Sequence, residues 1–147
     1  AVLALMLYQP EKPQVLFSLP AFESINLDGK VVTESALRQG GVVHFFRSTC
    51  GYCVMELAGW RIFKRQHPDV KLIAVLHKET IENAKVFFKN GVYPFDEVIY
   101  DPGEVLWEHL GAEYTPQTWF FNKDLESTLK FGVMSKDDFL TLSKAVS

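Results

Sequence analysis

The sequence predicts an α/β domain whose sheet is parallel at its centre. Apolar, β-branched runs at 42–46, 70–76 and 97–100 alternate with segments of helical pattern, as in parallel sheets with crossover helices. Two later apolar runs, 118–121 and 125–131, are separated by a short polar turn and add antiparallel strands. The 147 residues suffice for one domain with its own core and not for two.

The N-terminal part has a different character. The run 1–8 is apolar and a short linker follows it, so we divide the chain into an N-terminal segment, 1–18, and one domain, 19–147. Eight residues are too few to cross a bilayer, which needs about 20. The run is either a short element that packs on the domain or the end of a signal or anchor segment, which would tether the protein to a membrane.

Turn and helix signals bound the other elements. Asp28-Gly29 predicts a hairpin within 20–32, and a glycine ends a short helical stretch at 35–40. Four longer helices are expected: 50–66, ahead of Pro68; 79–90, with Thr80 as N-cap and Gly91 after its end; 103–110, between Pro102 and Gly111; and one after Ser135, an N-cap with Asp138 in the capping-box position.

Composition narrows the function classes. The formal net charge of −3 gives no reason to expect a nucleic acid or an anionic membrane surface as partner. The chain has two cysteines, Cys50 and Cys53, and its four histidines show no paired spacing. Since a structural zinc site needs four ligands, we expect no metal.

The two cysteines lie where the strand 42–46 gives way to a helix. Unpaired N–H groups and the positive end of the dipole at a helix N-terminus favour a thiolate on Cys50. Cys53, three residues later, returns to the same face and can close a small disulfide ring. We therefore expect a redox pair in which Cys50 attacks and Cys53 resolves, with no cofactor because the dithiol carries the electrons. A structural disulfide or half a zinc site is the alternative.

Two motifs carry a resemblance to a known family. Cys50-Gly-Tyr-Cys53 inside a βαβ unit resembles the thioredoxin pattern, and Tyr114-Thr-Pro116 before an apolar strand is similar to its cis-proline segment. The opening hairpin and Glu56, three residues after Cys53, resemble the TlpA/ResA-like branch of extracytoplasmic bacterial thiol–disulfide oxidoreductases. The resemblance implies a thioredoxin-like fold with a mixed central sheet flanked by helices and an N-terminal β-hairpin extension. It also implies disulfide exchange with the thiols and disulfides of partner proteins outside the cytoplasm.

The motif also departs from that branch. Thr49 replaces the usual tryptophan before the first cysteine, and Ala58 replaces a usual proline. Gly51-Tyr52 and Thr115 are similar to the DsbC-type isomerases, so a disulfide isomerase or oxidase is an alternative function. A non-catalytic interaction module on the same fold is another.

The resemblance extends to further site residues. Thr115 and Pro116, joined by a cis bond, would leave the Thr115 backbone free to pair with an extended substrate beside the disulfide, and Tyr52 would also bind substrate. Glu56 would exchange a proton with Cys53, unless it is an ordinary solvated glutamate. His44 takes the place of the buried aspartate of thioredoxins. It would favour the Cys50 thiolate, more strongly if protonated, unless it is a neutral core histidine held by one hydrogen bond.

Overall fold

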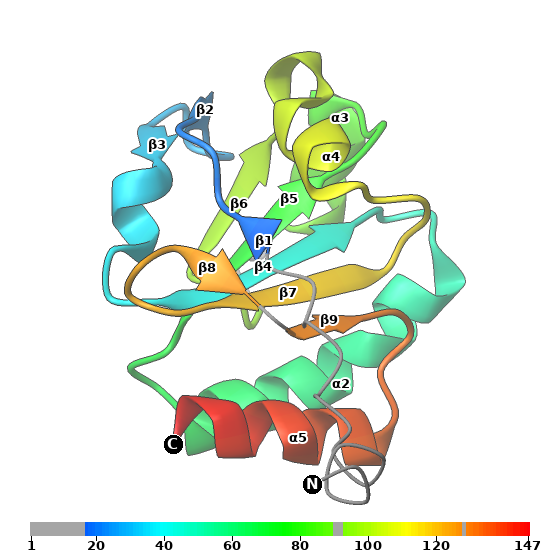
Figure 1. Cartoon of the computed structure of the whole chain (residues 1–147). Coiled ribbons are helices and arrows are strands. Elements are labelled where there is room, and N and C mark those ends of the chain that lie inside the picture. The colour runs from blue at the N-terminus through cyan, green and yellow to red at the C-terminus, as the bar shows by residue number, and fades with distance from the viewer. Residues whose placement is uncertain (1–16, 90–92, 128) are drawn as a thin grey trace, which may run out of the picture.

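The computed structural model (Figure 1) describes residues 17–89, 93–127 and 129–147, so the apolar run at 1–8 and its linker lie outside the described residues. The boundary between an N-terminal segment, 1–18, and the domain stays a prediction. In chain order the elements are β1 (Phe17–Ser18), β2 (Glu23–Ile25), β3 (Val31–Thr33), the 3-10 turn η1 (Glu34–Leu37), β4 (Gly41–Phe46), α2 (Gly51–Gln66), β5 (Lys71–Leu76), α3 (Ile81–Phe87), β6 (Glu97–Tyr100), the 3-10 turn η2 (Pro102–Glu104), α4 (Val105–Leu110), β7 (Gln117–Phe121), β8 (Glu126–Ser127), β9 (Leu129–Phe131) and α5 (Lys136–Val146).

The main sheet has five strands in the order β6-β5-β4-β7-β9. The first three are parallel to one another, whereas β7 is antiparallel to β4 and β9 is antiparallel to β7. The predicted mixed sheet is therefore confirmed. Strand β4 lies at its centre and all six of its residues are buried, which explains the continuous apolar run in the sequence.

Helices cover both faces of this sheet. Helices α2 and α5 lie together on one face, and α4 lies on the other side of the sheet (Figure 1). Each face has its own buried cluster: Trp60 and Phe63 of α2 belong to the first, and Leu106 and Leu110 of α4 to the second. Within the described part of the chain no helix is long and apolar enough to cross a membrane.

The predicted N-terminal hairpin is formed by β2 and β3. Its turn depends on Asn26, whose side-chain oxygen accepts hydrogen bonds from the backbone N–H groups of Asp28 and Lys30. Gly29 has a φ of +80°, a conformation that glycine adopts without steric cost. The preceding strand, β1, pairs instead with β8.

Helix α3 is shorter than predicted. Thr80 is its N-cap, as expected, and accepts a hydrogen bond from the Asn83 N–H. The helix ends at Phe87 rather than at 90, and Phe88 leaves helical geometry with its ring buried against Phe46. The helix therefore ends before the predicted stop, Gly91, which lies outside the described residues.

The predicted helix at 103–110 is split in two. Gly103 and Glu104 have φ values of +66° and +56°, so the turn η2 does not continue into α4. The Asp101 carboxylate accepts hydrogen bonds from the N–H groups of Leu106 and Trp107 and so caps α4 from a distance. This side-chain cap sets the start of α4 two residues later than the sequence predicts.

The C-terminal part contains one further difference. The predicted strand 125–131 is two short strands, because β8 pairs with β1 whereas β9 pairs with β7. The last helix begins as predicted: Ser135 and Asp138 each accept a hydrogen bond from the other's backbone N–H, which completes a capping box.

Candidate redox active site

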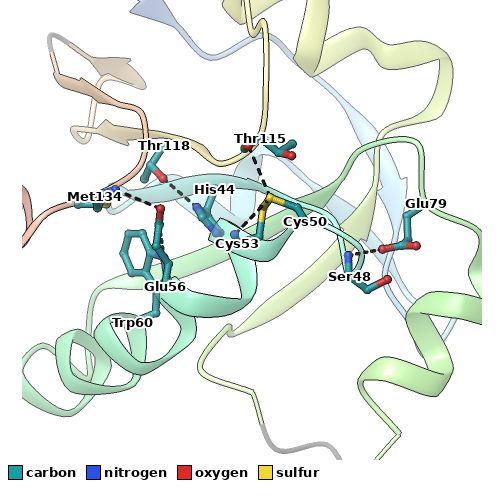
Figure 2. The surroundings of a disulfide bond; sticks show 10 residues. All are labelled: His44, Ser48, Cys50, Cys53, Glu56, Trp60, Glu79, Thr115, Thr118 and Met134. Carbon is teal, nitrogen blue, oxygen red and sulfur yellow. Dashed lines mark hydrogen bonds between the residues drawn. A yellow bond between two sulfur atoms is a disulfide. The ribbon is translucent and has the colours of Figure 1, made fainter.

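Cys50 and Cys53 form a disulfide at the start of α2 (Figure 2). Their Cα atoms are 5.2 Å apart. Cys50 is the N-cap residue of the helix, and its Sγ accepts a hydrogen bond of 3.2 Å from the Cys53 N–H. The sulfur that the sequence places at the helix N-terminus therefore receives one of the unpaired backbone donors there.

The two sulfurs differ in access. Cys53 has no exposed surface, whereas Cys50 is only half-buried. A partner thiol or disulfide coming from solvent can therefore reach Cys50 and not Cys53.

The loop that contains Thr115 and Pro116 lies next to the disulfide, although it is distant from it in the sequence. The peptide bond between these residues is cis, the isomer expected from the resemblance. The Thr115 carbonyl oxygen lies 3.5 Å from Cys50 Sγ, so the loop and the redox pair are adjacent (Figure 2). A reduced Cys50 thiol could donate a hydrogen bond to this oxygen.

Gln117 holds that loop in place, and sequence reasoning missed it. Its buried side-chain oxygen accepts hydrogen bonds from the N–H groups of Glu113, at 2.7 Å, and Tyr114, at 3.3 Å. A glutamine at the start of an apolar strand carries no signal of this role in the sequence.

Tyr52 lies in the first turn of α2, between the two cysteines. Its side chain is 61% exposed, so it is available at the surface beside Cys50. Its expected role in substrate binding remains a prediction.

Glu56 is buried, not solvated. It is 5% exposed and accepts two hydrogen bonds, from Trp60 Nε1 at 3.3 Å and from the Met134 N–H at 3.1 Å. Burial raises the pKa of its carboxyl to about 7, against the opposing effect of these two donors. The alternative that Glu56 is an ordinary surface residue is therefore wrong.

His44 is fully buried among the side chains around the disulfide (Figure 2). It lies opposite Thr118 in the β4–β7 register, and its Nδ1 shares a hydrogen bond of 2.8 Å with Thr118 Oγ1. Burial lowers the pKa of His44 to about 3. The imidazole is therefore neutral near pH 7, so the alternative of a neutral core histidine held by one hydrogen bond is confirmed, and attraction between a protonated His44 and the Cys50 thiolate is excluded.

Glu79 is a second residue that the sequence did not indicate. Its Oε2 accepts a hydrogen bond of 2.6 Å from the Ser48 N–H, in the loop between β4 and the disulfide (Figure 2). The contact joins residues 31 positions apart and holds the loop that leads from β4 to Cys50.

Comparison with known proteins supports the fold. No protein-family model matches the sequence, and no curated protein matches it. Among solved structures, StoA of Bacillus subtilis matches with a TM-score of 0.71 at 21% identity, over 92% of this chain and all of that one. An exposed lipoprotein thioredoxin of Streptococcus pneumoniae, Etrx1, matches with a TM-score of 0.71 at 26% identity, over 86% and 99%. A secreted Mycobacterium tuberculosis disulfide oxidoreductase, homologous to Escherichia coli DsbE, matches with a TM-score of 0.69 at 18% identity, over 84% and 95%.

These matches and the sheet order agree with the resemblance found in the sequence. The chain has the thioredoxin-like fold of these proteins, with a disulfide at the start of α2.

Proposed function

We propose that this protein is a thiol–disulfide oxidoreductase that exchanges disulfides with partner proteins through Cys50 and Cys53. The observation that carries the proposal is the disulfide at a helix N-terminus with one accessible sulfur, adjacent to the Thr115 carbonyl. A structural disulfide needs neither the difference in access nor the adjacent loop.

The reaction balances over two exchange steps. A substrate thiolate attacks Cys50 Sγ, the Cys50–Cys53 bond breaks, and Cys53 leaves as a thiolate, which takes up a proton. A second substrate thiolate attacks the substrate sulfur of the mixed disulfide, and Cys50 leaves as a thiolate. The substrate loses two electrons and the cysteine pair gains them. In the reverse direction Cys50 attacks a substrate disulfide and Cys53 resolves the mixed disulfide.

Backbone geometry supports Cys50 as the reacting group. The Cys53 N–H points at Cys50 Sγ, and the helix N-terminus adds a partial positive charge there. Both stabilise a thiolate more than a neutral thiol, so Cys50 is the better nucleophile and the better leaving group.

Substrate would dock along the Thr115 backbone. An extended segment that pairs with Thr115 runs past Cys50 Sγ, which is 3.5 Å from the Thr115 oxygen. Main-chain hydrogen bonds of this kind hold a peptide without regard to its sequence. The exposed ring of Tyr52, two residues after Cys50, would supply an apolar contact to the substrate.

Glu56 would exchange a proton with the thiol of Cys53. The two residues are one helical turn apart and both are buried, and a carboxyl with a pKa of about 7 can accept or release a proton at neutral pH. The rate at which Cys53 resolves a mixed disulfide should then follow the titration of Glu56.

We place the protein outside the cytoplasm of a bacterium, with a possible tether through an N-terminal segment. Two of the matched structures are described as a secreted protein and an exposed lipoprotein. The apolar run at 1–8 supports the same placement.

Trapping of mixed disulfides tests this function. Reduced Cys53→Ser should attack a model protein with scrambled disulfides through Cys50 and accumulate long-lived mixed disulfides, because no second thiol remains to release the substrate. Cys50→Ser should form none and should lose all exchange activity. Equal trapping by the two variants would contradict the assigned roles, and trapping by neither would contradict the function.

A further inference from the structure

A polar pocket lies next to the substrate loop and has no part in the chemistry described above. It lies where β4 and β5 end and α4 begins, and it has a volume of about 480 Å³. The residues that matter here are Arg47, His77, Lys78, Glu104, Trp107 and Thr115. We call it the Arg47 pocket.

Its position links it to the redox pair. Thr115 lines the pocket and its carbonyl oxygen lies 3.5 Å from Cys50 Sγ. A substrate segment paired with the Thr115 backbone would therefore run along the rim of the pocket. Because side chains of an extended segment alternate in direction, one close to the reacting cysteine can enter it.

Two residues that line the pocket each have a buried nitrogen atom with no hydrogen-bond partner among the described residues. These atoms are Arg47 Nε and His77 Nδ1. His77 is 7% exposed, and its ring stacks on Trp107 with centroids 3.4 Å apart, which fixes where its edge points. A buried donor without an acceptor is costly, and arginine can only donate.

The acidic groups of the pocket do not supply that acceptor. Glu104 Oε1 is 3.8 Å from His77 Nδ1, beyond hydrogen-bond distance, and Glu113 is exposed. Lys78 is exposed as well. With two cationic and two acidic side chains the lining is neutral overall, so selectivity would come from the hydrogen bonds that the Arg47 guanidinium offers and not from net charge.

We propose that the Arg47 pocket receives a carboxylate side chain of the substrate close to its reacting cysteine, and that it makes this protein prefer acidic substrate segments. The inference rests on the proposed function and adds the class of substrate to it. A carboxylate accepts hydrogen bonds only and can pair with the Arg47 guanidinium through two parallel bonds, whereas a lysine or an apolar side chain accepts none.

Peptide probes test the preference. Each probe is a short peptide whose cysteine is activated as an uncharged pyridyl disulfide, with Glu, Gln or Lys placed one or two positions before or after the cysteine. Reduced Cys53→Ser protein attacks through Cys50, forms the peptide mixed disulfide and releases thiopyridone, whose absorbance gives the rate constant. At the best position we expect the Glu probe to react about tenfold faster than the Gln probe, since only the carboxylate forms a charge-assisted hydrogen bond with Arg47.

Substitutions of Arg47 test whether the pocket causes the preference for the Glu probe. Arg47→Gln should bring the Glu-to-Gln ratio close to one, and Arg47→Glu should favour the Lys probe. Arg38→Gln removes the same charge from an exposed site on another part of the domain and should leave the ratio unchanged. The ratio, unlike the rate itself, does not respond to a change in Cys50 reactivity.

The outcomes separate the two proposals. If the probes react through Cys50 at equal rates, or if Arg47→Gln keeps the ratio, the pocket has no such role and the proposed function stands. If no probe reacts, the proposed function fails, and the substrate class fails with it.

Discussion

Two buried histidines near the disulfide have opposite surroundings. His44, in the centre of β4, has no exposed surface, shares a hydrogen bond with Thr118 and stacks against Phe95. His77, just after β5, is nearly as buried and stacks against Trp107, but it lines a pocket and its Nδ1 has no hydrogen-bond partner among the described residues.

The comparison distinguishes a closed region of the site, around His44 and Glu56, from an open region, around Arg47 and His77. Below the disulfide, His44 and Glu56 have protein partners, so their protonation is set by burial inside the fold. Arg47 and His77 instead line the open pocket, and each has a buried nitrogen without a hydrogen-bond partner among the described residues. The closed region should therefore govern stability and redox poise, and the open region should govern which substrates react.

The largest effect is expected from Glu56→Gln. Burial raises the pKa of Glu56 from its ordinary 4.5 to about 7, so the folded protein holds this proton where the unfolded chain has lost it. Its contribution to stability is complete below pH 4.5 and is lost as pH rises through about 7. Relative to Glu56→Gln, the wild type should lose about 3 kcal/mol of unfolding free energy over this range.

Urea unfolding of the disulfide form at several pH values measures this difference. Glu108→Gln, on the exposed side of α4, is the control and should follow the wild type. A pH-independent difference between wild type and Glu56→Gln would show that Glu56 does not titrate as a buried acid.

A smaller loss is expected from Thr118→Val. The change preserves the shape of the side chain but removes the hydrogen-bond partner of His44, whose Nε2 already has none among the described residues. The unfolding free energy should fall by about 1–3 kcal/mol, the usual cost of a buried unpaired polar group. Thr141→Val, at an exposed position on α5, should change it by less than about 0.5 kcal/mol. An equally small effect at Thr118 would mean that the His44 contact contributes nothing.

His44→Asp should change the redox properties by an intermediate amount. A buried carboxylate near the dithiol opposes the Cys50 thiolate and so stabilises the disulfide relative to the dithiol. We expect a higher Cys50 pKa and a potential more negative by tens of millivolts, where about 30 mV corresponds to about 1.4 kcal/mol. Iodoacetamide labelling against pH and a glutathione titration measure the two. An unchanged potential would show that the residue at position 44 does not influence the redox potential.

The smallest effect is expected in the open region. His77→Phe keeps a flat ring against Trp107 and removes the unpaired Nδ1, so stability should change by less than about 1 kcal/mol. The same change at His44 should be clearly destabilising, because Thr118 would lose its partner. Equal losses at the two positions would contradict the distinction between the regions.

The sequence predicted what depends on neighbouring residues. The Cys50–Cys53 pair, its helix, the hairpin turn at Asp28-Gly29 and the capping box at Ser135 all follow from local spacing and local hydrogen bonds. The mixed sheet follows from the alternation of strands and helices together with the late hairpin.

Contacts between distant residues could not be predicted in the same way. Glu56 is bonded to Met134, 78 positions away, and His44 to Thr118, 74 positions away. Both depend on strand register and helix packing, which one sequence does not specify. The charge state of His44 was left open for the same reason: the sequence shows a histidine in a buried strand but not how completely it is desolvated.

The Arg47 pocket is the clearest example of a feature that depends on contacts between distant residues. It brings together residues that follow β4 and β5 with others from η2, α4 and the Thr115 loop. The break at Glu104 helps to shape it, and that break arises because the Asp101 side chain caps α4 in place of a regular first turn. The sequence indicates only a helix that follows Pro102.

The most direct test is the redox equilibrium of Cys50 and Cys53 with glutathione buffers of defined ratio, followed by mass shift after alkylation. We predict a reversible two-electron equilibrium with a potential less negative than the roughly −270 mV of thioredoxin. The physical reason is that a neutral His44 replaces a buried carboxylate, while the helix N-terminus and the Cys53 N–H stabilise the Cys50 thiolate. A potential as negative as that of thioredoxin would contradict this electrostatic explanation, and a disulfide that does not exchange at any glutathione ratio would contradict the redox function itself.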